Sequence, residues 1–496
     1  MTIAVTEEIF NRIRELFSKI EKEEDIQRVI EYTRQTVNGI GCQIVSKYLE
    51  EKDREIFEER DRERYRDKGK RHRHIQTLMG YVEYDRHRYV DRSEDAEKKL
   101  VYLLDEEMGL LSHETVCDEL GREMINGACV DSYRIASKRL REISGMSLAH
   151  QQVWHYVQRA GNMALNNVSK MQKLEKSGES RGEISSKLLY FENDGIWLSL
   201  QGQSRKENNG LRSKEMKVGV AYDGVRYHIS KTGKKRRILD EKVAIATFDG
   251  AKEFERKKRA VVADHYDMTA VDLIIKNGDG AGWIQKKEPE IETILVLDEF
   301  HRNKKLRECV DEADAIKAIQ SLLYANETDA ALDTIESMIL SLGDESDSRD
   351  KKEKLTELYN FYADNRTALA SPYARGIEIP KTREPGVIHH ARLGSMESNI
   401  YTIIGKRMKD NRCSWSIKGA NNLAYLLCLY HTDRLDEVFK TVPDPTPFEE
   451  DIFDKAPLSV KQATATIGKG YEYPYTASID PRETWLKDIA LFKSMI

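Results

Sequence analysis

Two acidic residues stand beside glycines at the ends of apolar runs, and a third opens a later helix. The run 188–194 ends at Asp194, the run 271–280 ends at Asp279, and Glu397 lies in the first turn of the expected helix. Carboxylates brought together in this way hold two Mg²⁺ ions about 3.5–4 Å apart for phosphodiester chemistry, with Mn²⁺ as an alternative ion. We therefore predict Asp194, Asp279 and Glu397 as catalytic residues and metal ligands.

Each of these carboxylates also has an ordinary structural explanation. Aspartate before glycine is common in turns, and glutamate in a first helical turn is favoured by the helix dipole. Glu192 lies two residues before Asp194 on the same strand face, so it is an alternative first ligand. Asp298 also ends an apolar strand and is an alternative second ligand. With His301, three positions later, Asp298 is otherwise a supporting residue that orients the metal ligands.

The bulk composition limits the classes of protein that fit. The 496 residues allow about two to four domains. The formal net charge of −5 means that any binding to a polyanion must come from local patches. No apolar stretch approaches ~20 residues and the N-terminus lacks a signal-peptide pattern, which predicts no membrane span. The 6 scattered cysteines form no Cys-x-x-Cys pair, as expected for a cytoplasmic protein.

A change to a two-residue period from Lys187 onward predicts the sheet that must position the carboxylates. The expected strands are 188–194, 215–222, 225–230 and 243–248, then 273–276 and 293–297 after a basic helix over 251–263. Asp223 and Gly224 are read as a turn, and a short helix is expected from Trp283. Three antiparallel strands, a helix and two parallel strands are the order of the ribonuclease-H-like fold. In that order Asp194 and Asp279 lie side by side at the carboxyl ends of neighbouring strands.

The N-terminal region is predicted to be mainly helical, with one hairpin. Apolar stripes predict helix over 6–60, and Gly80 separates two β-prone runs. The hairpin would carry Arg86, His87 and Arg88, either as a solvated surface or as an arm that contacts phosphates.

A helix–turn–helix pattern follows, with a helix over 132–143, a turn at Gly145 and Ser147 as the N-cap of the next helix. Many helical hairpins share this pattern without contacting DNA. As a DNA-binding element it would present four side chains to base edges or phosphates: His150, Gln151, His155 and Arg159.

We therefore predict an α+β multidomain chain. N-terminal helices and a basic hairpin (1–98) precede a helical DNA-binding region (99–180). The ribonuclease-H-like catalytic core (181–302) is interrupted by a helical insertion (303–385) and completed by the last core helix with Glu397 (386–430). A tail of unassigned role follows (431–496).

At this point the chain resembles a known family, the ISLre-type transposases of bacterial insertion sequences, within the wider Mutator-like DDE group. The resemblance spans nearly the whole chain. It is carried by 192–196 (ENDGI), 278–284 (GDGAGWI), 297–302 (LDEFHR), 394–398 (GSMES) and 415–419 (WSIKG).

The resemblance implies a DDE triad of Asp194, Asp279 and Glu397. Asp298 and His301 match the (Cys or Asp)-x-x-His signature of the Mutator-like group, which favours Asp279 over Asp298 as the second ligand. Asn193 departs from the small residue expected before the first aspartate, which leaves the choice between Glu192 and Asp194 open.

The implied activity is Mg-dependent hydrolysis of a phosphodiester at the element's terminal inverted repeats, followed by strand transfer into target DNA. The expected partners are these double-stranded DNAs, bound by a homodimer or higher oligomer. Lys406, Arg407 and Lys409 would project towards DNA phosphates, whereas Trp415 is expected in the core rather than stacked on a base. The alternatives are a nuclease or resolvase on the same fold, and a catalytically silent DNA-binding protein derived from a transposase.

Overall fold

Three separate hydrophobic cores organise the part of the chain that the computed structural model describes, residues 7–94, 99–110, 115–282, 284, 288, 290–342, 346–390 and 394–440. The largest core contains Phe191 and Leu426, a second contains Leu358, and a third contains Leu49 and Val82. The chain is thus a mixed α+β protein of several domains. No helix within these ranges combines the length and apolar character needed to cross a bilayer.

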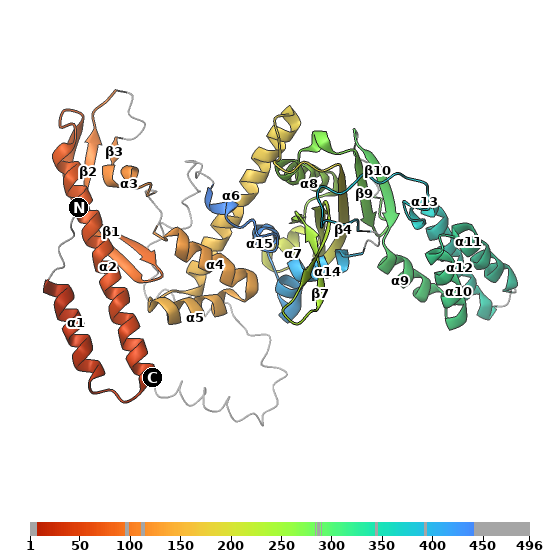
Figure 1. The fold of residues 1–496 in the computed structure, drawn as a ribbon, viewed down its shortest axis with the longest axis horizontal. Coiled ribbons are helices and arrows are strands. Elements are labelled where there is room, and N and C mark those ends of the chain that lie inside the picture. Colours follow the sequence, from red (N-terminus) through yellow and green to blue (C-terminus); the bar gives the residue numbers. More distant parts are fainter. Residues whose placement is uncertain are drawn as a thin grey trace. The chain divides into compact units, whose positions relative to one another are not determined.

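The N-terminal domain pairs two helices with a β-hairpin (Figure 1). It comprises α1 (Glu7–Ile20), α2 (Ile26–Glu59), β1 (Tyr65–Thr77), β2 (Gly80–Asp91), β3 (Leu100–Val101) and α3 (Leu103–Glu107). The hairpin predicted around Gly80 is confirmed, while the predicted helix over 6–60 is divided. Asp25 accepts a hydrogen bond from Gln27 N at 2.9 Å and caps α2.

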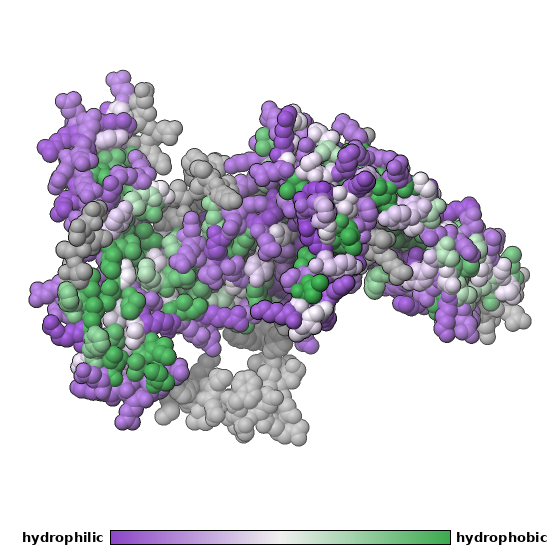
Figure 2. Space-filling model, in the orientation of Figure 1, coloured by the Kyte–Doolittle hydropathy of each residue, from purple (hydrophilic) through white to green (hydrophobic). Residues whose placement is uncertain are grey.

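An apolar stripe on α2 remains exposed to solvent. Ile30, Val37 and Ile44 follow one another at seven-residue spacing and are 54%, 56% and 40% exposed. Figure 2 shows apolar residues gathered over α1 and α2. Such spacing is typical of helices that pack against another helix.

The basic side chains of the hairpin divide between the interior and the surface. Arg73 and Arg86 form ion pairs with the buried Asp105 of α3, at 2.6 and 2.8 Å. His87 Nδ1 lies 2.6 Å from Asp53 Oδ2 on α2. Arg86 and His87 therefore fasten the hairpin to the helices, whereas several basic residues of β1 are exposed. Phosphate contact by the hairpin stays a prediction.

The helix–turn–helix segment contains α4 (Asp118–Val130), α5 (Tyr133–Ser144) and α6 (His150–Ser177). The turn at Gly145 is confirmed, with φ of +72°. The N-cap of α6 is Ala149 rather than Ser147, because the Gln152 side chain reaches back to accept a hydrogen bond from Ala149 N at 2.8 Å. The helix also extends well beyond residue 161. At Gly161 its backbone packs so closely on Asn422 that a Cβ would lie 2.6 Å from the Asn422 carbonyl oxygen.

Five strands form one sheet in the order β10-β9-β4-β5-β8 (Figure 1). Its strands are β4 (Leu188–Ser199), β5 (Ser213–Tyr222), β8 (Val243–Thr247), β9 (Leu273–Gly278) and β10 (Glu292–Leu297). β5 is antiparallel to β4 and β8, whereas β9 is parallel to β4 and β10. The predicted order of three antiparallel strands, a helix and two parallel strands is confirmed.

Two local expectations about this sheet were wrong. β4 does not turn at Asp194 and Gly195, because β5 pairs alongside it as far as Ser199. β6 (Gly224–Ile229) pairs with β7 (Lys235–Asp240), a strand that the sequence did not predict, in a separate two-stranded ribbon. The short helix expected from Trp283 falls at a position outside the described residues.

Helices cover both faces of the sheet. α8 (Ala251–His265) packs on one face, where Phe254 and Lys258 lie against Gly219. α14 (Met396–Ile400) continues as the π-helix η2 (Tyr401–Lys409) and packs on β4 from the opposite face. The remaining short elements are α7 (Gly202–Glu207), η1 (Met268–Ala270), η3 (Asp410–Arg412), α15 (Ile417–Tyr430) and α16 (Glu437–Lys440).

A helical domain with its own core lies between β10 and α14 in the sequence. It contains α9 (Glu299–Cys309), α10 (Ala313–Tyr324), α11 (Thr328–Ser341), α12 (Ser346–Asp364) and α13 (Arg366–Leu369). The helices predicted for the insertion are present, although they begin before residue 303 and end well before 385.

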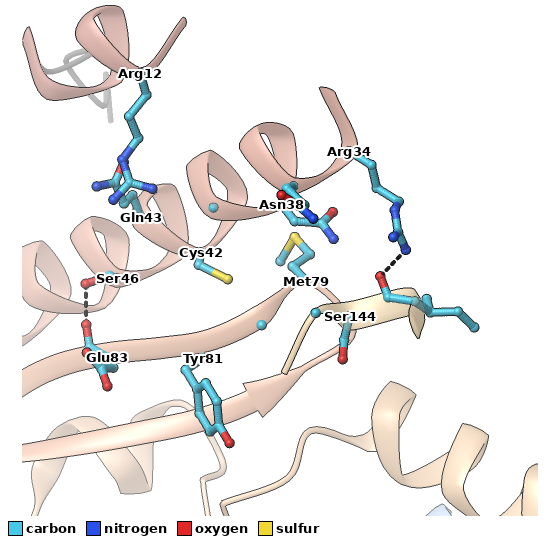
Figure 3. Close-up of a pocket in the computed structure, with 15 residues that line it drawn as sticks. Arg12, Arg34, Asn38, Cys42, Gln43, Ser46, Met79, Tyr81, Glu83 and Ser144 are labelled. Atoms are coloured by element: carbon cyan, nitrogen blue, oxygen red, sulfur yellow. Dashed lines mark hydrogen bonds between the residues drawn. The ribbon is translucent and has the colours of Figure 1, made fainter. Parts of the chain in front are cut away.

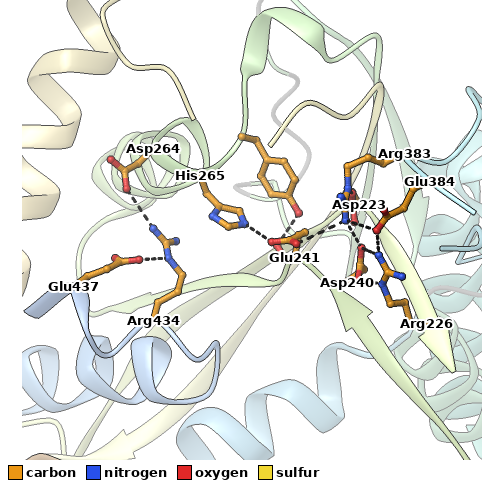
Figure 4. A network of polar contacts seen from close by, with 11 residues as sticks. Asp223, Arg226, Asp240, Glu241, Asp264, His265, Arg383, Glu384, Arg434 and Glu437 are labelled. Carbon is orange, nitrogen blue, oxygen red and sulfur yellow. Dashed lines mark hydrogen bonds and ion pairs between the residues drawn. The ribbon is translucent and has the colours of Figure 1, made fainter. Parts of the chain in front are cut away.

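An ion-pair network fastens the chain that returns from this domain to the base of the β6–β7 ribbon (Figure 4). Arg383 lies 2.8 Å from Asp223 Oδ2 and 2.7 Å from Asp240 Oδ2. Arg226 pairs with both Asp240 and Glu384. Because Asp223 is fully buried, its charge depends on Arg383 for compensation.

Replacing Arg383 by alanine is expected to lower the free energy of unfolding by about 3 kcal/mol, because Asp223 would remain buried without its partner. Urea denaturation measures this loss. Arg256→Ala serves as the control, since its ion pair with Glu253 is exposed on α8 and such pairs contribute less than about 1 kcal/mol. Equal losses in the two variants would contradict the assigned role of Arg383.

Candidate active site

Three carboxylates lie in one row across the parallel strands, with Asp194 inside β4 and with Asp279 and Asp298 directly after β9 and β10. The pairing of β4 with β9 ends at Glu192 opposite Asn277, and the pairing of β9 with β10 ends at Leu297 opposite Gly278. Continuing this register puts Asp194, Asp279 and Asp298 at matching positions. Side chains at matching positions point to the same face of a sheet. For these residues it is the face on which α14 packs.

Asp194 is a buried carboxylate in an anionic surrounding. Gly195 N donates a hydrogen bond to its Oδ1 at 2.6 Å. Burial, together with the negative charges of Asp279 and Glu397, raises the pKa of Asp194 to about 6, although His301 and the hydrogen bond from Gly195 oppose this rise. The three predicted ligands are therefore close enough to act on one another electrostatically.

Asp279 occupies a tight turn directly after β9. Its Oδ1 accepts a hydrogen bond from Ala281 N at 2.8 Å, and Gly280 adopts φ of +89°, which favours glycine. Asp279 thus fulfils the ordinary role of a turn aspartate as well as lying beside Asp194. The two roles are compatible, since the turn bond occupies one of its two oxygens.

Both carboxylate oxygens of Asp298 accept hydrogen bonds from neighbouring groups, including His301. Its Oδ2 caps α9 by accepting from Phe300 N at 3.0 Å and from His301 N at 3.1 Å. Its Oδ1 accepts from Asn277 Nδ2 at 3.0 Å. His301 Nδ1 lies 3.2 Å from Asp298, and His301 Nε2 lies 3.8 Å from Asp194 Oδ2. His301 therefore bridges the two aspartates, the arrangement expected of a supporting pair.

The charges of this pair stabilise each other. Burial disfavours the Asp298 carboxylate, but the hydrogen bonds from His301 and Asn277 outweigh burial and lower the pKa of Asp298. Burial likewise opposes a charged His301, yet Asp298 and Asp194 raise the pKa of the ring. A protonated His301 would place positive charge beside Asp194.

Glu397 lies in the first turn of α14, with an exposed side chain between buried neighbours. Met396 and Ile400 anchor the helix in the core. Ser395, just before the helix, donates a hydrogen bond through Oγ to Glu192 Oε1 at 2.6 Å. The position of Glu397 over the sheet therefore depends on a contact between α14 and β4.

Glu192, the alternative first ligand, is fully buried beneath this contact. It accepts hydrogen bonds from Ser395 and from Tyr222 OH, and burial raises its pKa. Tyr222 OH also lies 2.6 Å from His390 Nδ1. Because the carboxyl group of Glu192 already bonds to these buried partners, it is less available to a metal ion. Asp194 is therefore favoured over Glu192 as the first metal ligand.

Sequence reasoning missed the buried partners of Glu192. Tyr222 ends an apolar strand and Ser395 precedes a helix, and both are positions where these residue types are common. The paired histidines 389 and 390 were the one available signal, since they stand just before the segment that carries Glu397.

His390 makes the stability of the protein sensitive to acid. Burial, together with the charge of Arg237, lowers its pKa from 6.5 to about 4. Below pH 6.5 His390 binds a proton in the unfolded chain but stays neutral in the folded chain until the pH approaches 4. This contribution to stability is therefore complete above pH 6.5 and is lost as the pH falls towards 4, in total about 3 kcal/mol.

His390→Asn is expected to reduce the loss of stability between pH 7 and pH 5 by about 2 kcal/mol, as measured by urea unfolding at both pH values. His228→Asn, an exposed position on β6, is the control. A wild-type pH dependence in His390→Asn would contradict the burial of a neutral ring.

The carboxylates fit a hard divalent cation by donor type but are not gathered around one. Within the described ranges, no group of three or more His, Cys, Asp or Glu side chains is arranged to hold a metal ion. Mg²⁺ prefers oxygen ligands and keeps part of its water shell, so one or two carboxylates suffice for each ion. Asp194, Asp279 and Glu397 offer only oxygens, and their mutual repulsion would be relieved by a cation.

The predicted DNA-binding residues of α6 lie on its first three turns. Gln151 is exposed, whereas His150, His155 and Arg159 are half-buried. The guanidinium of Arg159 stacks 5.2 Å over the ring of Tyr156, and burial lowers the pKa of His155. Of the four residues, Gln151 has the most accessible side chain.

The basic residues of η2 divide between surface and interior. Lys406 and Lys409 are exposed as expected, but Arg407 is buried and donates through Nε to Ala128 O at 2.6 Å. The expected projection of Arg407 towards DNA is therefore corrected. Residues 401–409 form a π-helix rather than an α-helix, which changes the side on which each residue falls. The expected core position of Trp415 is confirmed, with Nε1 donating to Met408 O at 2.8 Å.

A cavity of about 780 Å³ lies elsewhere, where α2 and the tip of the hairpin meet the end of α5 (Figure 3). Arg34 donates from Nη1 to the carbonyl oxygen of Ile143 at 2.7 Å at its edge. The cavity mixes polar and apolar side chains, including Asn38, Cys42 and Met79. It joins the N-terminal domain to the helix–turn–helix and lacks the paired carboxylates of the sheet, so we assign the chemistry to the sheet.

Comparison with known proteins identifies a family. A model of an uncharacterised protein family, UPF0236, matches residues 20–436, and the chain belongs to this family. A curated relative from Streptococcus gallolyticus, described as "UPF0236 protein in vanSb 3'region", is 23% identical over 368 residues, 72% of each protein. Neither description names an activity.

Proposed function

We propose that this member of the UPF0236 family is a DDE-type DNA transposase that binds the terminal inverted repeats of its element and catalyses Mg-dependent phosphodiester hydrolysis and strand transfer. The observation that carries the proposal is the row of Asp194 and Asp279 on the sheet face beneath the helix of Glu397. The negative charges of Asp279 and Glu397 both raise the pKa of the buried Asp194, which supports a site where the three carboxylates would share cations.

The topology supports a ribonuclease-H-like catalytic core. The strand order β10-β9-β4-β5-β8, with β5 alone antiparallel to both neighbours, is the order of that fold. A helical domain between the last strand and the helix of Glu397 agrees with the insertion that DDE enzymes of this type carry. Fold likeness alone does not establish chemistry, so the proposal depends on the carboxylates.

The residues of the site would divide the work of the reaction. Divalent cations, when bound, activate the attacking oxygen and stabilise the leaving one. Asp194, Asp279 and Glu397 would hold them. Asp298 orients His301, and the positive charge of His301 beside Asp194 would help to position the scissile phosphate.

Two further features support the expected partners. The helix–turn–helix offers Gln151 at the start of α6 for contact with a duplex, and Lys406 and Lys409 add exposed positive charge beside α14. The apolar stripe of α2 is a surface through which two copies would pair when they hold two element ends.

A strand-transfer assay tests the proposal. Purified protein is incubated with Mg²⁺, a labelled duplex taken from the sequences that flank its gene, and a supercoiled target plasmid. We expect the labelled strand to be joined to the plasmid. Cleavage without joining would favour a nuclease or resolvase, and binding without cleavage would favour a silent DNA-binding derivative.

A further inference from the structure

The β6–β7 ribbon stands apart from the sheet as a closed two-stranded hairpin. Its register runs from Gly224 opposite Asp240 to Ile229 opposite Lys235. The turn is closed by a hydrogen bond from Ser230 N to the carbonyl oxygen of Lys234 at 3.0 Å. The ribbon is thus an ordered element rather than an irregular loop.

The outer half of this ribbon concentrates positive charge. Residues 231–237 contain five basic side chains and no acidic one, all five exposed: Lys231, Lys234, Lys235, Arg236 and Arg237. None of them forms an ion pair with a carboxylate in the part of the chain that the structure describes. On a chain with a net charge of −5, such a cluster marks a local anion-binding surface.

Exposed apolar side chains alternate with these charges. Tyr227 is 54% exposed and lies opposite Arg237, and Ile229 is 60% exposed and lies opposite Lys235. Residues paired across two strands share a face. The same face therefore offers both cations and an aromatic ring, a combination suited to phosphate and sugar contacts.

The base of the ribbon is fixed to the segment that leads to the site. Asp223 and Asp240 are both held by Arg383, and Val225 and Ile388 exchange two backbone hydrogen bonds of 3.0 Å. This segment continues through His390 to Ser395 and Glu397. The ribbon is therefore held at its base, while its charged tip makes no ion pair with the described residues.

We propose that the β6–β7 ribbon is a DNA-binding arm that contacts the phosphate backbone of the duplex engaged by the carboxylates, an inference that rests on the proposed function. A two-stranded ribbon is narrow enough to enter a major groove about 12 Å wide. Double-stranded DNA presents one negative charge per roughly 1.7 Å, so it offers a dense row of anions to the cations of the tip.

The test is duplex binding by the triple variant K234A/K235A/R236A, measured by fluorescence anisotropy in EDTA over a range of salt concentrations. The probe is the labelled duplex from the sequences that flank the gene. The matched control is K304A/R307A/K317A, which removes the same charge from exposed positions of α9 and α10. Thermal unfolding of both variants establishes that they fold.

We expect the ribbon variant to bind at least tenfold more weakly, with a dependence of log K on log salt that is shallower by up to about 3, because each phosphate contact contributes about 0.9. The control should change little. Equal losses in both variants, or unchanged binding by the ribbon variant, would overturn the inference. An arm that served an acidic protein would likewise leave duplex binding unchanged.

The binding measurement separates this inference from the proposed chemistry. If duplex binding depends on the ribbon but the wild-type protein never cleaves DNA, the ribbon inference holds and the proposed transposase activity is wrong. If the wild-type protein cleaves and joins DNA but the ribbon variant binds normally, the proposed activity holds and the ribbon inference is wrong.

Discussion

Asp279→Asn is expected to lower strand cleavage and joining by a thousandfold or more, equivalent to at least about 4 kcal/mol of transition-state stabilisation. The amide removes the negative charge that would hold a cation beside Asp194, while its oxygen can still accept the turn bond from Ala281 N. The fold and duplex binding should therefore remain. Gel analysis of labelled DNA with Mg²⁺ gives the rates, and anisotropy in EDTA gives the binding.

Asp298→Asn is the matched comparison, because it is also an aspartate at a strand end of the same row. Its carboxylate caps α9 and orients His301, so the loss of activity should be the smaller one typical of supporting residues, about 10–100-fold. A larger loss of activity in Asp298→Asn than in Asp279→Asn would show that Asp298, not Asp279, is the second metal ligand. Undiminished cleavage by Asp279→Asn would remove the proposed site.

Replacement by the neutral amide should affect activity very differently at Glu192 and at Asp194. Burial raises the pKa of Glu192, and glutamine keeps the shape of the side chain with an oxygen that can still accept from Ser395 and Tyr222. We expect Glu192→Gln to keep most of the activity, and Asp194→Asn to lose it by a thousandfold or more if it is a cation ligand.

Truncation at Glu192 separates its structural role further. Glu192→Ala removes the acceptor of two buried hydroxyl groups and leaves a cavity, at an expected cost of about 2–4 kcal/mol in the free energy of unfolding. Denaturant unfolding of the alanine and glutamine variants checks this. An inactive but fully stable Glu192→Gln, combined with an active Asp194→Asn, would assign the first ligand to Glu192 instead.

The sequence was informative wherever a local pattern and the fold agreed. Apolar runs of strand length predicted the order of the central strands, and the stripe of Met396, Ile400 and Ile403 predicted the helix of Glu397. These patterns are predictive because the apolar side of each strand or helix is the side that is buried in the folded protein. The N-cap role of Asp298 on α9 could likewise be anticipated, since a strand-end aspartate before a helix is a frequent cap.

The sequence failed where a distant partner decides the local structure. Asp194 and Gly195 have turn propensity, but β5 supplies a hydrogen-bonding edge along the whole of β4 and keeps both residues in the strand. Residues 235–240 are too polar to predict as a strand, and they pair because β6 lies alongside. Arg407 was expected at the surface, but distant partners explain its burial: it donates to the carbonyl of Ala128 and lies over the rings of Tyr133 and Trp415.

The long insertion between β10 and α14 has a consequence for the order in which the molecule is made. A chain still on the ribosome, with synthesis stopped at residue 370, already contains the sheet with Asp194 and Asp279. It lacks Glu397 and also Ser395, whose hydroxyl donates a hydrogen bond to the buried Glu192 of β4. Under the proposed function, such a nascent chain cannot nick the very gene from which it is being translated, and competence arises only as the closing helix emerges.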